Sequence, residues 1–68
     1  MLIKVILTPE KERKEVELPK NTKIYDLVKK LNLNPDTVIV LRGDTPVPID
    51  DVLAKEETLE IVRVISGG

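Results

Sequence analysis

The chain begins with two stretches in which apolar and polar positions alternate, the pattern of strands with one buried face. In residues 2–8 the charge of Lys4 marks the solvent side, and residues 14–18 alternate in the same way. The charged stretch 9–13 between them predicts a turn, and therefore an antiparallel hairpin with a solvated, charged edge. The side chains expected to point inward are Ile3, Val5, Leu7, Val16 and Leu18.

The next segment changes to the period of an α-helix. One apolar stripe at helical spacing is formed by Ile24, Leu27, Val28 and Leu31. Thr22 is expected to be the N-cap, because its hydroxyl can accept a hydrogen bond from a free amide of the first turn. Asn32, Asn34 and Pro35 are expected to end the helix. The stripe therefore predicts a helix that covers one face of a sheet.

Three further strands are predicted in the second half of the chain. Residues 38–41 are apolar and precede a turn at Gly43-Asp44. Residues 45–48 hold two prolines, which lack ladder donors, so they predict a short edge strand. Residues 58–64 form the most uniformly apolar strand and are expected inside the sheet. The side chains expected to face the helix are Ile39, Leu41, Leu59 and Ile61.

The order of these elements predicts an α+β fold of the β-grasp type. A mixed sheet of four to five strands would pack on one main helix, with the last strand parallel to the first. We expect residues 1–64 to form this domain. Ser66, Gly67 and Gly68 have little side chain to pack, so residues 65–68 are expected to be a flexible C-terminal tail.

Composition excludes several classes of function. The chain has no Cys and no His, which removes thiol nucleophiles, thiolate zinc sites and imidazole bases. One aromatic residue and a net charge of −1 argue against binding nucleic acid. The adjacent Asp50 and Asp51 have no third ligand nearby and are interpreted as turn residues, so no metal site is predicted. With no signal-peptide or transmembrane pattern, we expect a soluble cytoplasmic protein without membrane contact.

The face of the sheet opposite the helix is expected to be apolar. Alternation would place Leu2, Ile6, Val38, Val40, Val62 and Val64 there. An apolar patch of this kind indicates a binding site. The expected partner-binding surface consists of Ile6, Val38, Val40, Val62, Arg63, Val64, Ile65 and Ser66. The alternatives are that the patch self-associates or is screened by the stems of Lys4 and Lys14.

Three segments of the chain resemble one known family. These are Ile-Val-Arg-Val-Ile-Ser-Gly-Gly at residues 61–68, Val-Leu-Arg-Gly-Asp-Thr-Pro-Val-Pro at 40–48, and the helix after Asn21-Thr22. Over nearly its whole length the chain is similar to the ubiquitin-like sulfur carriers of thiamine and molybdopterin synthesis and to the small archaeal modifiers, above all the latter. Arg42-Gly43 departs from the Asn-Gly pair typical of thiamine carriers.

The resemblance implies a function for the C-terminal glycines. In such proteins an E1-like adenylating enzyme activates the carboxylate, here that of Gly68 after Gly67. The adenylate is converted to a thiocarboxylate that supplies a sulfur-accepting synthase, or it is joined to lysines of target proteins. ATP and Mg²⁺ belong to the activating enzyme, so the chain itself is expected to bind no cofactor. It is expected to be a monomer and not an enzyme, with no catalytic residue of its own.

Two other functions remain open. The first is a non-covalent β-grasp interaction module in which the Gly-Gly end is incidental. The second is an RNA-associated β-grasp domain, against which the acidic balance and the near absence of aromatic residues argue. Within the carrier hypothesis, the sequence leaves open thiamine, molybdopterin, thiolated tRNA and protein tagging.

Overall fold

The computed structural model describes residues 1–64, so the expectations for the tail at residues 65–68 lie outside the described residues. The elements follow the predicted order, with one additional 3-10 helix. They are β1 (Leu2–Thr8), β2 (Glu12–Glu17), α1 (Ile24–Lys30), η1 (Pro35–Thr37), β3 (Val38–Arg42), β4 (Thr45–Val47) and β5 (Thr58–Arg63).

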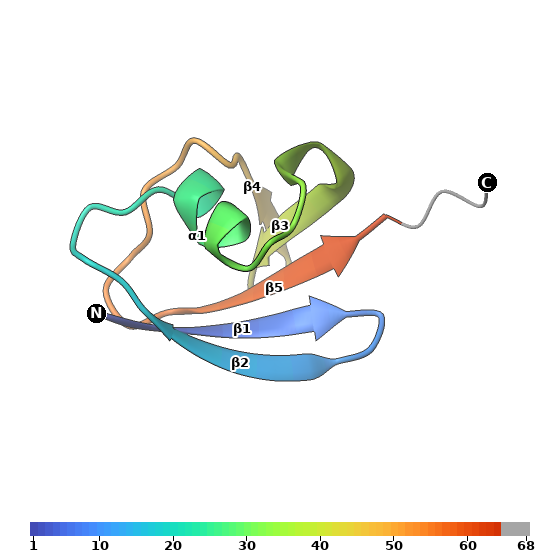
Figure 1. Ribbon diagram of the computed structural model, residues 1–68, viewed down its shortest axis with the longest axis horizontal. Coiled ribbons are helices and arrows are strands. Elements are labelled where there is room, and N and C mark those ends of the chain that lie inside the picture. The colour runs from blue at the N-terminus through green and yellow to red at the C-terminus, as the bar shows by residue number, and fades with distance from the viewer. Residues whose placement is uncertain (65–68) are drawn as a thin grey trace.

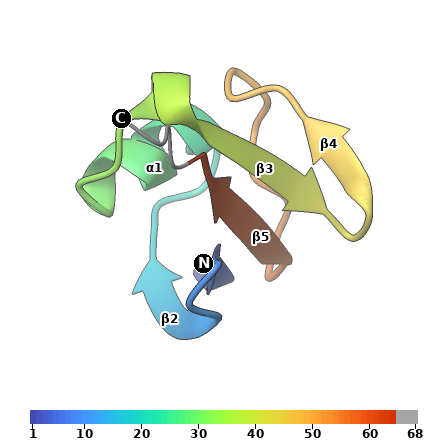
Figure 2. The same ribbon diagram turned by 90° about the vertical axis from the view of Figure 1, so that its right-hand side faces the viewer.

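The strands of residues 1–64 form one mixed, five-stranded sheet in the order β2-β1-β5-β3-β4. As predicted, β5 lies in the centre, where it runs parallel to β1 and antiparallel to β3. The short strand β4 lies at one edge, also as predicted, and β2 lies at the other. Helix α1 packs on one face of this sheet, and the opposite face carries no helix of the described chain (Figure 1, Figure 2). The β-grasp fold is thus confirmed.

The helix stripe and the inner face of the sheet form the hydrophobic core. Ile24, Leu27 and Val28 are fully buried, and Leu31 is half-buried against the same cluster, as the helical spacing predicts. The other buried apolar residues are Ile3, Val5, Leu7, Leu18, Val40, Leu53, Leu59 and Ile61. The inward assignments for β1 and β5 are therefore correct.

The predicted phase of β3 is wrong by one residue. Val40 is buried with 1% of its surface exposed, whereas Ile39 is 48% exposed. Val38 also packs against the core, so Val38 and Val40 do not belong to the outer face. Residues 38–41 are all apolar, and no polar side chain marks which positions face solvent. The phase is instead decided by pairing with β5, which places Val40 opposite the buried Ile61.

The predicted hairpin forms, but its second strand begins earlier than expected. Strand β2 includes Glu12 and Arg13, which were assigned to the turn, and it ends before Leu18. Register pairs Ile3 with Val16 on the inner face and Ile6 with Arg13 on the outer face. Backbone pairing with β1 therefore extends into the charged stretch, because charged side chains on an edge strand can remain in solvent while the backbone pairs.

The helix begins without the side-chain cap that was predicted. The N-cap is Lys23, and the Thr22 hydroxyl donates to the carbonyl of Pro19 at 2.7 Å. The first helical amides are satisfied by a distant segment: Ile24 N–H donates to Asp51 O at 2.9 Å, and Tyr25 N–H donates to Ile49 O at 2.7 Å. A tertiary contact thus replaces the local cap, because these carbonyls accept hydrogen bonds from first-turn amides of the kind that the Thr22 hydroxyl was expected to satisfy.

The helix ends as the sequence predicts, with Asn32 in the left-handed conformation at φ 61°. Asn32 N–H donates to Lys29 O at 2.9 Å, and Leu33 N–H donates to Val28 O at 3.1 Å. This pair of bonds is the Schellman motif, in which Asn tolerates the positive φ. Leu33 then packs against the core, which turns the chain toward η1 and β3.

A polar cluster holds the long connection between β4 and β5 to the end of β3. Arg42 donates from Nε to Glu57 Oε1 at 2.6 Å and from Nη2 to Glu57 Oε2 at 2.9 Å. Glu57 also accepts the Ala54 N–H at 2.6 Å, and Arg42 reaches Asp51 at 3.5 Å. Desolvation raises the pKa of Glu57, but the hydrogen bonds from Arg42 and Ala54 and the arginine charge outweigh it, so that pKa is lowered. The Glu57 hydrogen bond in turn raises the pKa of Arg42.

The corrected phase of β3 can be tested with two adjacent substitutions. Val40→Asp should lower the free energy of unfolding by several kcal/mol, about 3 or more, because it buries an unpaired carboxylate in the core. Ile39→Asp should cost about 1 kcal/mol or less, since the position is half exposed. Thermal and urea denaturation measure both. Equal losses, or a larger loss for Ile39→Asp, would contradict the register.

The lowered pKa of Glu57 predicts a dependence of stability on pH. A carboxyl group whose folded-state pKa is depressed stabilises the fold above its unfolded pKa, near 4.5, and that contribution is lost as pH falls through the folded value. Glu57→Gln should therefore lower the free energy of unfolding at pH 7 by about 1–2 kcal/mol, and its deficit should shrink below about pH 4. Urea denaturation across pH measures this, with the exposed neighbour substitution Glu56→Gln as the control. A deficit that stays constant with pH would contradict the ion pair.

Candidate partner-binding face

The outer face is the side of the sheet that faces away from α1. Strand register aligns its side chains in rows that cross the sheet. The first row runs Arg13, Ile6, Glu60, Leu41 and Pro46. The second row runs Thr8, Val62 and Ile39. The outer face thus brings aliphatic side chains from three strands together around β5.

One carboxylate lies within this aliphatic group. Glu60 is half-buried in the middle of β5, with Ile6 beside it on β1 and Leu41 beside it on β3. The Thr8 hydroxyl donates to Glu60 Oε2 at 2.8 Å, which orients the carboxylate toward the second row. The alternation of Leu59, Glu60 and Ile61 could have indicated an outward Glu60, but the sequence interpretation did not include it in the binding surface.

The structure retains part of the predicted binding surface. Ile6 and Val62 lie on the outer face as expected, and both are half-buried. Val64 is 55% exposed, and its N–H donates to Thr37 O at 2.9 Å, which joins the end of β5 to η1. Val38 and Val40 are removed from the surface by the phase of β3. Ile65, Ser66, Gly67 and Gly68 lie outside the described residues.

The residues that replace Val38 and Val40 are Ile39 and Leu41. Both were assigned to the core, and both point outward beside β5. The predicted apolar outer face therefore exists, but β3 contributes the opposite pair of side chains to it.

Arg63 follows the inner phase of β5, as its position two residues after Ile61 predicts. Its Nη2 forms an ion pair with the Glu10 carboxylate in the turn between β1 and β2. This contact links the hairpin turn to the end of β5, and Figure 1 shows both at the same end of the molecule. Arg63 thus holds the end of β5 to the hairpin turn, five positions before Gly68 in the sequence.

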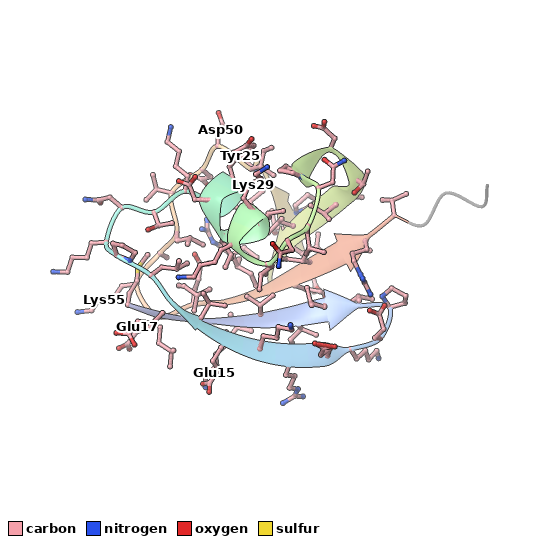
Figure 3. All side chains as sticks on the ribbon, viewed as in Figure 1. Glu15, Glu17, Tyr25, Lys29, Asp50 and Lys55 are labelled. Atoms are coloured by element: carbon pink, nitrogen blue, oxygen red, sulfur yellow. The ribbon has the colours of Figure 1, made fainter. Side chains whose placement is uncertain are left out.

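Charged side chains border the outer face along β2. Glu15 and Glu17 project away from the helix (Figure 3), opposite Lys4 and Leu2 of β1. Arg13 lies beside Ile6, and a shallow depression there is lined by Lys4, Ile6, Arg13, Glu15 and Thr58 among others. Lys14 pairs with Val5 and so lies on the inner side, where it contacts Glu12 at 3.4 Å. Lys14 also lines the depression beside Ile6 and Arg13.

Within residues 1–64 no group of three or more acidic side chains converges as a metal site would require. Asp51 instead accepts the Val52 N–H at 2.9 Å and contacts Arg42, as a turn residue does. In the same part of the chain, no helix has the length and apolar character needed to cross a membrane.

A sequence model of the family small archaeal modifier protein 2 matches residues 1–65. The chain belongs to this family. Sulfur carrier protein TtuB of Thermus thermophilus is 42% identical over 57 residues, which cover 84% of this chain and 88% of that protein. An uncharacterized protein of Archaeoglobus fulgidus is 45% identical over 58 residues, which cover 84% of this chain and 85% of that protein. The family is thus one of ubiquitin-like modifiers, with a sulfur carrier among its relatives.

Among solved structures, the fold matches that of Caldiarchaeum subterraneum ubiquitin. The two superpose with a TM-score of 0.78 at 18% identity, over 100% of this chain and 98% of the other. At that identity the likeness establishes the ubiquitin-like fold alone.

Proposed function

We propose that this chain is a ubiquitin-like sulfur carrier and protein modifier, activated at the carboxylate of Gly68 by an E1-like adenylating enzyme. Membership of the small archaeal modifier family carries the proposal, and the 42% identity to a sulfur carrier supports it. The chain acts as a monomer in the cytoplasm, where ATP is available to the enzyme. It is a substrate and carrier rather than an enzyme.

Activation makes a poor acyl donor into a good one. A Gly68 carboxylate oxygen attacks the α-phosphorus of ATP, and pyrophosphate leaves. The resulting acyl-adenylate carries AMP as its leaving group. Hydrosulfide supplied by a partner then attacks the carbonyl carbon and expels AMP, and loss of the proton on sulfur leaves a thiocarboxylate for a sulfur-accepting synthase. Attack by a target lysine amine, with loss of a proton, forms an isopeptide bond instead. The enzyme holds ATP and Mg²⁺, and this chain supplies the acyl group.

The outer face is the surface on which the enzyme would dock. Ile39 and Val62 form an aliphatic row on either side of the β3–β5 pairing. Gly68 follows Val62 by six positions in the sequence, and six extended residues span at most about 20 Å. An enzyme that covers this row could therefore receive the Gly68 carboxylate at a nucleotide site within about that distance.

The alternative is a non-covalent β-grasp interaction module, which would use the same face without any chemistry at Gly68. Mass spectrometry of the native protein separates the two. A carrier shows the mass change of one oxygen replaced by sulfur, and a modifier leaves a Gly-Gly remnant on target lysines. The acceptor, whether a synthase or a set of lysines, follows from which of these products is found.

Removal of Gly67 and Gly68 is expected to abolish activation and to leave the fold unchanged. Among the described residues the last member of the core is Ile61, and the two glycines carry no side chain to pack, so the melting temperature should stay within error of the full chain. ATP–pyrophosphate exchange with the adenylating enzyme measures activation. A truncated chain that still supports exchange would contradict the proposal.

Ile39→Asp is expected to weaken docking while the protein stays folded. A carboxylate placed there would be desolvated against the partner, so the KM for this chain in pyrophosphate exchange should rise about tenfold or more. Tyr25→Asp is the matched control: Tyr25 is 43% exposed against 48% for Ile39, but it lies on the helix, away from the outer face (Figure 3). If both substitutions change KM equally, or neither does, the outer face is not the docking surface.

A further inference from the structure

The carboxylate of Glu60 gives the outer face a chemical selectivity that its aliphatic residues cannot supply. We propose that this face binds a partner surface that presents one arginine or lysine within an apolar surround, and that Glu60 is the counter-charge for that cation. The proposal names the chemistry of the docking partner and rests on the proposed function, in which that partner is the adenylating enzyme.

The surroundings of Glu60 are those of a charge that docking would desolvate. Ile6 and Leu41 flank it across the sheet, and Val62 follows on the same face of β5. The side chain is already half-buried, and Thr8 supplies one hydrogen bond at 2.8 Å. One neutral hydroxyl leaves most of the acceptor capacity of a carboxylate to water. A partner that covers the aliphatic rows would remove that water.

Glu60 forms no ion pair with any residue of the described chain, while other carboxylates near the sheet do. Glu10 pairs with Arg63, and Glu57 pairs with Arg42. Lys4 is the next outward-facing residue of β1 before Ile6, and register places it opposite Thr58. It is therefore a neighbour of Glu60 on the outer face, but the two form no ion pair. A purely apolar partner would leave a buried, uncompensated charge and be rejected, whereas a partner cation would restore the lost solvation. The face therefore discriminates between partners of similar shape.

A second copy of this chain is disfavoured as the occupant when the dimer axis lies at Glu60. A symmetric dimer centred on the outer face would bring the two Glu60 carboxylates toward one another. Like charges desolvated at the centre of an interface oppose association. The occupant in this proposal is therefore a different protein with a basic residue at the matching position, and a dimer is an outcome of the test below.

The test compares Glu60→Gln with the native chain in ATP–pyrophosphate exchange, using the E1-like enzyme of the source organism at several salt concentrations. Gln keeps the shape and can still accept from Thr8, but it removes the charge. The KM should rise about tenfold or more with kcat unchanged, and its increase with salt should become flatter than that of the native chain. Glu60→Lys should raise KM further.

Asp50→Asn is the matched control, because Asp50 is also a carboxylate but lies exposed in the connection between β4 and β5, on the helix side of the molecule (Figure 3). Its KM should equal that of the native chain, and thermal melts confirm that each variant is folded. If the native chain is activated while Glu60→Gln keeps the native KM and salt dependence, this inference is wrong and the proposed function stands.

If the native chain is not activated at all, the proposed function fails and the inference falls with it. Sedimentation covers the remaining case: a dimer that Glu60→Gln strengthens would show that a second copy covers the face and would overturn the inference.

Discussion

The pairing of β5 on both of its sides is the constraint on which the rest of the structure depends. Its inward residues Leu59 and Ile61 meet the core residues of β1 and β3, and its outward residues Glu60 and Val62 meet Ile6 and Ile39 among others. A slip of one residue would bury the Glu60 carboxylate and expose Ile61. The free-energy cost of burying that charge therefore favours the observed register over the slipped one. The observed register in turn decides which side chains of β1 and β3 face the helix and which face away from it.

The connection between β4 and β5 performs a second structural task. Its carbonyls at Ile49 and Asp51 accept the first amides of α1, and its Glu57 is fixed by Arg42. The helix therefore depends for its start on a segment that is held to the sheet by an ion pair. Helix and sheet are joined here by hydrogen bonds as well as by the apolar stripe, which matters in a domain of 68 residues with a small core.

The two faces of the sheet differ in what covers them, and we propose recognition for the outer one. The helix packs on the apolar part of the inner face, and the outer face carries aliphatic residues around one carboxylate. Apolar area gives affinity with little discrimination, whereas a charge that must be matched gives specificity. Under the proposed function, such a combination would separate the choice of partner from the chemistry at Gly68.

The sequence alone determined the five strands, the main helix and their order, though neither η1 nor the start of β2. It also determined the core of α1, β1 and β5, because helical spacing at Ile24, Leu27 and Val28 and the charge of Lys4 leave one reading of each. The family resemblance lay in local segments and in the glycine pair, so it was also readable. The phase of β3 was not: a run of aliphatic residues such as Val38–Leu41 has no polar marker, and pairing with Ile61 decided it. The start of the helix depended on the carbonyls of Ile49 and Asp51, more than twenty positions away in the sequence. The position of Glu60 between Ile6 and Leu41 depended on the order of the strands in the sheet, and the periodicity of side chains along one strand does not encode that order.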